Sequence, residues 1–139
     1  MERSMFAVMI VPNLLYIVAA GAAEPPRIKP GLWEIRVQAT GYSSPPVIGC
    51  IGAMSDQQRQ LEQANIRKLC SKHESRELDG KWVVDAVCAA GGNTVTQRVT
   101  TSLAGDSFHE ENKGSRGNNT SDGKWLGACK PGQKPDMFK

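Results

Sequence analysis

The sequence predicts a mainly β protein with a single small domain, folded as an antiparallel meander or a partly open barrel with one short helix and two disulfides. Three observations lead to this fold class. The chain has 139 residues, which is enough for one ordinary domain. Several short runs alternate apolar with polar residues and are separated by turns rich in Gly, Asn and Asp. Four cysteines supply cross-links that compensate for a small apolar core.

Residues 1–23 have the three regions of a secretory signal peptide. Arg3 precedes an apolar run at residues 5–20, and the small residues 21–23 then lead into a polar segment. An uncleaved membrane anchor is the alternative, but a span needs about 20 apolar residues, and a proline and an asparagine interrupt this run. We therefore expect cleavage, a mature domain at residues 24–139 without a transmembrane segment, and a periplasmic or secreted location.

The mature part of the chain carries four cysteines in wide spacing, Cys50, Cys70, Cys88 and Cys129. An even number of cysteines in a small exported chain predicts two disulfides, for which three connectivities exist. A zinc site is the competing use of four thiolates. Paired C-x-x-C knuckles are absent, so the pattern favours disulfides over zinc.

One predicted hairpin selects a connectivity. An Asp-Gly turn signal lies between Cys70 and Cys88, flanked by strand-like runs. A three-residue loop at residues 78–80 pairs Glu77 with Lys81, and the same register places the two cysteines opposite each other. The predicted disulfides are therefore Cys70–Cys88 and Cys50–Cys129.

The front of the mature chain predicts an extended lead-in and two strands. Residues 24–30 are rich in proline. From Gly31 to Ala39, apolar and polar residues alternate with the period of a half-buried strand. A turn at residues 41–46 then leads to a short second strand at residues 47–50.

One helix is expected, and it begins after Ser55. Ser55 and Gln58 have the spacing of a capping box, in which each side chain bonds the other residue's backbone. The side of the helix that repeats at helical spacing is only weakly apolar, because it carries Leu61, Ala64, Asn65 and Lys68. We therefore expect the helix to lie at the edge of a sheet and outside the core.

Strand signals return in the second half of the chain. Further strands are expected at residues 81–88, 93–103, 107–112 and 125–129. Residues 113–123 are rich in Gly, Ser and Asn, and we expect a flexible loop there. Residues 130–139 form a basic tail, for which solvent exposure is the simplest expectation.

Three segments together resemble the bacterial exported family DUF3617, a domain of unknown function. They are Lys29–Ile35 (KPGLWEI), the turn Gly105–Phe108, and Trp125–Cys129 followed by Lys130–Met137. The resemblance covers nearly the whole mature chain, and the chain departs from the family pattern between Glu110 and Asp122. The resemblance implies a periplasmic or secreted β-rich protein, and it brings no assigned activity and no catalytic residues that could be transferred to this chain.

Three tryptophans are weak candidates for ligand binding. Trp33, Trp82 and Trp125 each lie in a predicted strand of a chain with few aromatic residues. Aromatic walls with a few polar groups are typical of pockets for small apolar molecules. Large aromatic residues also fill the core of small sheet proteins, so a core role is the alternative for each.

Two histidines are candidates for enzyme chemistry. His73 and His109 both have acidic neighbours, but adjacent side chains on a strand point to opposite faces. His109 therefore shares a face with Glu111 and not with Glu110. Because a third metal ligand is not evident, we assign no metal, no cofactor and no catalytic residue.

These observations predict an exported cell-envelope protein without enzymatic activity that binds a small apolar ligand or a partner protein. The alternative is a small metal-dependent or hydrolytic enzyme that uses His73 or His109. A third alternative is a structural envelope protein recognised through an edge strand. The net charge of +3 is spread along the chain, which does not favour a nucleic-acid partner.

Overall fold

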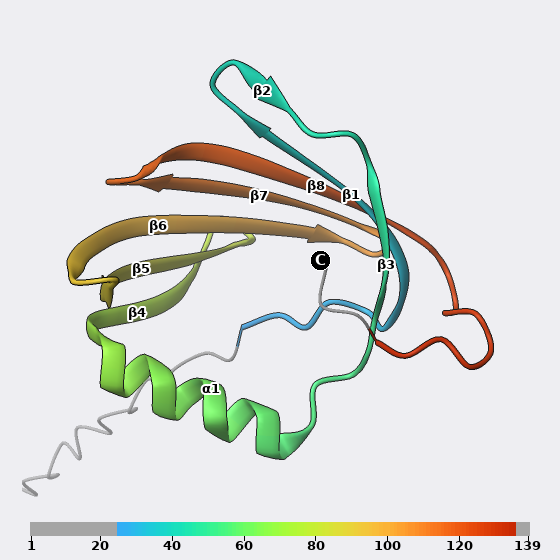
Figure 1. Cartoon of the computed structure of the whole chain (residues 1–139), viewed down its shortest axis with the longest axis horizontal. Coiled ribbons are helices and arrows are strands. Elements are labelled where there is room, and N and C mark those ends of the chain that lie inside the picture. Colours follow the sequence, from blue (N-terminus) through green and yellow to red (C-terminus); the bar gives the residue numbers. More distant parts are fainter. Residues whose placement is uncertain (1–24, 136–139) are drawn as a thin grey trace, which may run out of the picture.

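The computed structural model describes residues 25–135, which form one curved antiparallel sheet and one helix (Figure 1). The sheet has the order β2-β1-β8-β7-β6-β5-β4, and β3 pairs with β1 beside this path. The elements are β1 (Gly31–Ala39), β2 (Tyr42–Ser43), β3 (Val47–Ile51), α1 (Asp56–Leu69), β4 (Cys70–Leu78), β5 (Lys81–Ala90), β6 (Asn93–Ala104), β7 (Ser107–Gly114) and β8 (Gly117–Gly127). The predicted fold class is confirmed. The predicted signal peptide at residues 1–23 and the end of the basic tail lie outside the described residues.

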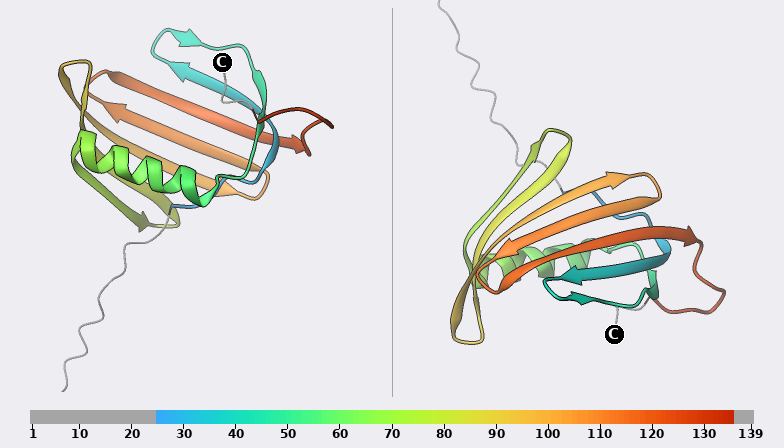
Figure 2. Two further views of the ribbon diagram at one scale, coloured as in Figure 1. Left: turned by 60° about the horizontal axis from the view of Figure 1, so that its bottom comes forward. Right: turned by 90° about the horizontal axis from the view of Figure 1, so that it is seen from above.

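Five consecutive strands, β4 to β8, form a meander of hairpins, and β8 then pairs with β1 from the start of the domain. The strands arch over α1, which lies on the concave side of the sheet between the β3 end and the β4 end (Figures 1 and 2). The sheet therefore has the shape of an open barrel. Within residues 25–135, no helix is long and apolar enough to cross a membrane.

The β4–β5 hairpin has a different turn from the predicted one. Asp79 and Gly80 form a two-residue turn with φ angles of 51° and 72°, the conformation that Asp-Gly favours between twisted strands. Leu78 pairs with Lys81, so the predicted three-residue loop at residues 78–80 and the pairing of Glu77 with Lys81 are wrong.

A bulge at the other end of the hairpin corrects this difference in register. Between Cys70 and Lys72 the pairing shifts by one residue, and Cys70 lies opposite Cys88 as predicted. These two cysteines form one disulfide, with Cα atoms 3.9 Å apart. Cys50 and Cys129 form the other, with Cα atoms 5.5 Å apart. The second disulfide joins β3 to the chain after β8.

Residues 113–123 are not a loop, and this prediction is wrong. β7 continues to Gly114, a turn follows at residues 115–116, and β8 begins at Gly117. β8 pairs with β7 on one side and with β1 on the other, so two hydrogen-bonded ladders hold a segment that has little apolar alternation. The Ser115 backbone N–H also donates to the Thr96 carbonyl oxygen at 2.9 Å, which fixes the turn against β6. The predicted strand at residues 125–129 coincides with the end of β8 as far as Gly127, and residues 128–129 lie beyond the strand.

The helix begins where the sequence predicts. Ser55 Oγ accepts a hydrogen bond from the Gln58 backbone N–H at 3.1 Å, and Gln58 Oε1 accepts one from the Ser55 N–H at 2.8 Å. None of the helix residues is buried. α1 approaches the edge strand β4 and its neighbour β5. Its partly buried residues are Arg59 and Ile66, whereas the predicted face of Leu61, Ala64, Asn65 and Lys68 is exposed, so the prediction of that face is wrong.

The core of the described chain is small. Its buried hydrophobic residues are Trp33, Cys50, Trp82, Val83, Ala86 and Phe108. The rings of Trp33 and Phe108 have centroids 5.5 Å apart, a favourable tilted arrangement. The Phe108 ring lies over Gly123, where the Cβ of any other residue would overlap it. Gly123 is therefore required for the close approach of β7 and β8.

Candidate functional site

The concave side of the sheet carries most of the large apolar side chains. Directly opposed residues of antiparallel strands point to the same face, so the strand registers place Trp33, Ile35, Val37, Trp82, Val84, Ala86, Val99, Phe108 and Trp125 on one face, here called the inner face. The Trp33 indole Nε1–H donates to the Lys29 carbonyl oxygen at 2.8 Å. Residues 25–30 lie beneath the arch of the sheet, on the same side as α1 (Figure 1), so the inner face is the concave one.

Trp33 and Trp125 lie opposite each other in the β1–β8 ladder. Trp33 is 1% exposed and belongs to the core. Trp125 is partly exposed, its Nε1–H donates to the Pro30 carbonyl oxygen at 3.2 Å, and the Lys29 ammonium lies 3.4 Å from its ring centroid. These two tryptophans therefore anchor the lead-in segment on the inner face, and their polar atoms have partners.

Trp82 lies on β5, away from the other two tryptophans. Its side chain is buried, and its Nε1 atom has no hydrogen-bond partner in the part of the chain that the structure describes. An indole N–H withdrawn from water without an acceptor costs about 1–3 kcal/mol. The Trp82 Nε1–H is therefore a buried hydrogen-bond donor on the inner face without an acceptor in the described residues.

The rest of the inner face is only half covered. Ile35, Val37, Val84 and Val99 are neither buried nor fully exposed. Across from them, α1 contributes two partly buried side chains, Ile66 and Arg59, whereas Leu61 is 59% exposed. A helix that buries none of its residues leaves an apolar concave surface partly accessible.

A short polar strip crosses the inner face beside Trp82. Thr101 on β6 lies opposite Trp82, and Glu110 on β7 lies opposite Thr101. Thr101 Oγ1 donates to Glu110 Oε2 at 3.4 Å, and both residues are partly buried. Sequence reasoning considered Glu110 only as a neighbour of His109. The alternation along β7 was the signal that Glu110 shares the face of Phe108.

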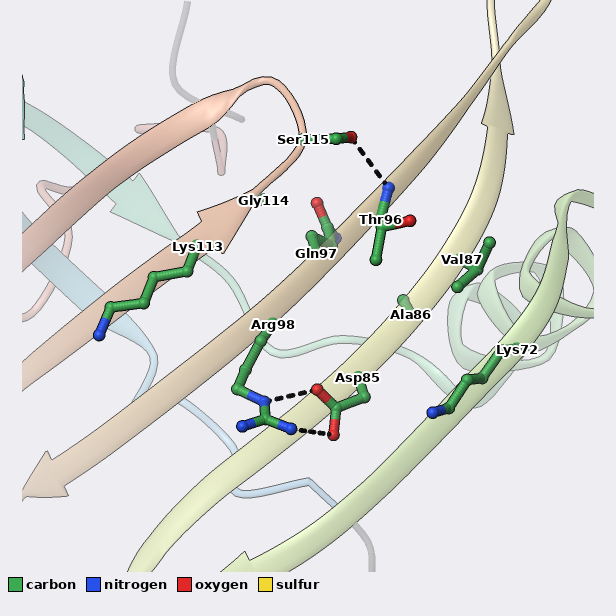
Figure 3. Close-up of a pocket in the computed structure, with 10 residues that line it drawn as sticks. All are labelled: Lys72, Asp85, Ala86, Val87, Thr96, Gln97, Arg98, Lys113, Gly114 and Ser115. Atoms are coloured by element: carbon green, nitrogen blue, oxygen red, sulfur yellow. Dashed lines mark hydrogen bonds and ion pairs between the residues drawn. The ribbon is translucent and has the colours of Figure 1, made fainter.

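The opposite, convex face is charged and is here called the outer face. Asp85 accepts hydrogen bonds from Arg98 at 2.6 and 3.1 Å and from Arg76 at 2.7 Å. The hydrogen bonds to Arg98 and then Arg76 hold the pKa of Asp85 well below its ordinary range. Lys72 and Lys113 lie on either side of this cluster (Figure 3), around a hollow of about 290 Å³.

The structure does not bring the two histidines together. His73 on β4 lies opposite Ala86 and shares the inner face, whereas His109 lies on the outer face with Asp122 opposite it. His109 Nδ1 is 2.7 Å from Asp122 Oδ1, and Nε2 is 3.7 Å from Glu111 Oε1. The hydrogen bond to Asp122 raises the pKa of His109 above its ordinary value. Within residues 25–135, no three His, Cys, Asp or Glu side chains are placed to hold a metal ion.

The protein belongs to the class of small, disulfide-linked β proteins with an open antiparallel barrel and an apolar concave face. Two structural disulfides indicate an oxidising environment. The chain matches the model of DUF3617, a family described as a protein of unknown function, over residues 28–129, and it belongs to that family. The match confirms the resemblance seen in the sequence. No curated protein and no solved structure matches the chain.

Proposed function

We propose that this protein is an exported, periplasmic or secreted binding module that holds a small, largely apolar ligand on the inner face. The observation that carries the proposal is the half-covered apolar surface formed by Ile35, Val37, Val84 and Val99 opposite a helix without buried residues. An apolar concave surface with a few polar groups is the usual form of a small-molecule site. The disulfides and the signal-peptide pattern at residues 1–23 support the location.

The polar groups on the inner face restrict the ligand class. Trp82 offers a hydrogen-bond donor without a partner, and Glu110 offers an acceptor. A ligand with an apolar body and one hydroxyl group satisfies both, because a hydroxyl oxygen accepts one hydrogen bond and its hydrogen donates another.

Titration with the neutral apolar dye N-phenyl-1-naphthylamine tests the proposed surface. We expect a saturable rise in dye fluorescence with the mature protein. Val99→Gln places a polar amide on the inner face and weakens dye binding roughly tenfold. Thr100→Gln is the matched control, because Thr100 is the sequence neighbour of Val99, lies on the outer face and is also partly buried. Absence of saturable binding, or equal weakening by both substitutions, contradicts the proposal.

Competition with decan-1-ol then tests the ligand class. Trp82→Phe keeps an aromatic ring but removes the indole N–H, so decan-1-ol displaces the dye less effectively from this variant than from the wild type. Trp125→Phe serves as the control, because the Trp125 N–H already has the Pro30 carbonyl oxygen as its acceptor. An unchanged competition constant in Trp82→Phe excludes the role assigned to Trp82.

A further inference from the structure

β4 forms a free edge of the sheet. The strand order ends at β4, and within the described chain no backbone segment pairs with the edge of β4 that faces away from β5. Figure 2 shows the β4–β5 hairpin at the outermost end of the curved sheet. A nine-residue edge strand presents a row of backbone donors and acceptors to which another extended segment can add.

Charged side chains on an edge strand ordinarily prevent such pairing. On β4, however, the order of the charges is antisymmetric about Ser75. Glu74 and Arg76 flank Ser75 on the outer face, and His73 and Glu77 flank it on the inner face. The residues one and two positions before Ser75 thus each have a complementary residue at the same distance after it, and Lys72 has the uncharged Leu78.

We propose that β4 is a self-association surface whose partner is a second copy of this chain, paired antiparallel about a two-fold axis at Ser75. In this register Glu74 lies opposite Arg76 of the second copy, and His73 lies opposite Glu77 of the second copy. Opposed residues share a face, so both pairs meet side by side. The two sheets join into one continuous sheet with the same concave side.

Neighbouring registers are disfavoured, so the charges select one. An axis at Glu74 places Lys72 opposite Arg76 of the second copy and opposes the two Glu74 carboxylates. An axis at Arg76 opposes the two Arg76 guanidinium groups. Like charges directly opposite each other on adjacent strands are destabilising.

The side chains that form these pairs are available in the single chain. Glu74 is 66% exposed and makes only a 3.6 Å contact with Lys72, a kind of surface pair that contributes little. Arg76 donates to Asp85 through one nitrogen and keeps further N–H donors. The bulge lies between Cys70 and Lys72, before the segment that pairs.

Engineered cysteines test the register. In the mature oxidised protein, Ser75→Cys places the two new thiols opposite each other at the axis, so an intermolecular disulfide forms and a covalent dimer is found in non-reducing gels. Leu78→Cys is the control on the same strand, because Leu78 takes part in neither charge pair and its two thiols lie about 20 Å apart along the strands. Peptide mapping verifies that both native disulfides remain. Cross-linking of neither variant, or of both equally, overturns the register.

Sedimentation of the chain without added cysteines tests the association itself. We expect the wild type to shift from monomer to dimer with increasing concentration. Glu74→Lys opposes Arg76 with a like charge and weakens dimerisation roughly tenfold. Glu62→Lys, the same charge change on the exposed side of α1, leaves it unchanged. A monomer at every concentration up to the millimolar range, or equal effects of both substitutions, overturns the proposal. Neither result depends on the dye experiments.

Discussion

At the scale of single residues, the charge state of His109 is set by its neighbours on the outer face. Asp122 lies directly opposite it, and Glu111 lies two residues along the same strand. The bond to Asp122 favours the protonated imidazole, so the folded-state pKa lies above the ordinary value of 6.5. The stabilisation is therefore fully present below the unfolded-state pKa and is lost as the pH rises through the folded-state pKa.

Asp122→Asn tests this assignment, because it removes the carboxylate and keeps a side chain of the same size. We expect the NMR titration of the His109 ring proton to move to lower pH. The variant should lose more unfolding free energy relative to wild type at about pH 5 than at about pH 8.5. Glu111→Gln should produce a smaller change, since Asp122 is the main cause of the shift. An equal loss at both pH values would show that the bond is not linked to protonation.

At the scale of elements, the disulfide Cys70–Cys88 was predictable although the turn was not. Asp-Gly indicated a hairpin, and the sequence placed it correctly between the two cysteines. The two-residue turn moved the register by one residue, and the bulge before Lys72 moved it back. Turn signals locate a hairpin, but bulges change its register without a clear signal in a polar strand.

The first part of β8 was not predictable because tertiary pairing forms it. Gly117, Asn118 and Asn119 have low strand propensity and no apolar alternation. Pairing with β7 and β1 overrides that local preference. The signals for β1 and for the helix cap at Ser55 were local, and the structure follows them.

Removal of each disulfide as a pair of alanines tests how these elements are held together. The chain-entropy account predicts a loss of about 3 kcal/mol of unfolding free energy for Cys70→Ala with Cys88→Ala, because this disulfide joins residues 18 apart in sequence. It predicts about 4.5 kcal/mol for Cys50→Ala with Cys129→Ala, at a separation of 79. Guanidinium unfolding of the two double variants measures both values. A larger loss for the shorter loop would show that local strain or packing, and not loop closure, determines the contribution.

At the scale of the whole molecule, a curved sheet with a small core leaves part of its apolar surface open. Alternation within each strand indicated which residues share a face, and it correctly marked Trp33 and Trp82 as members of predicted strands. It did not relate one strand to another, because that needs the registers. The opposite placement of His73 and His109, and the polar strip at Glu110, became visible only with the strands aligned.

The central claim is that the inner face holds a small apolar ligand, and native mass spectrometry of protein exported to the periplasm and gently purified tests it most directly. One spectrum gives the mass of the processed chain, the number of disulfides and the mass of any retained molecule. We predict extra mass that leaves on denaturation and is reduced in Val99→Gln. A bare mature chain with two disulfides, found together with a failure to bind the apolar dye, would contradict the claim.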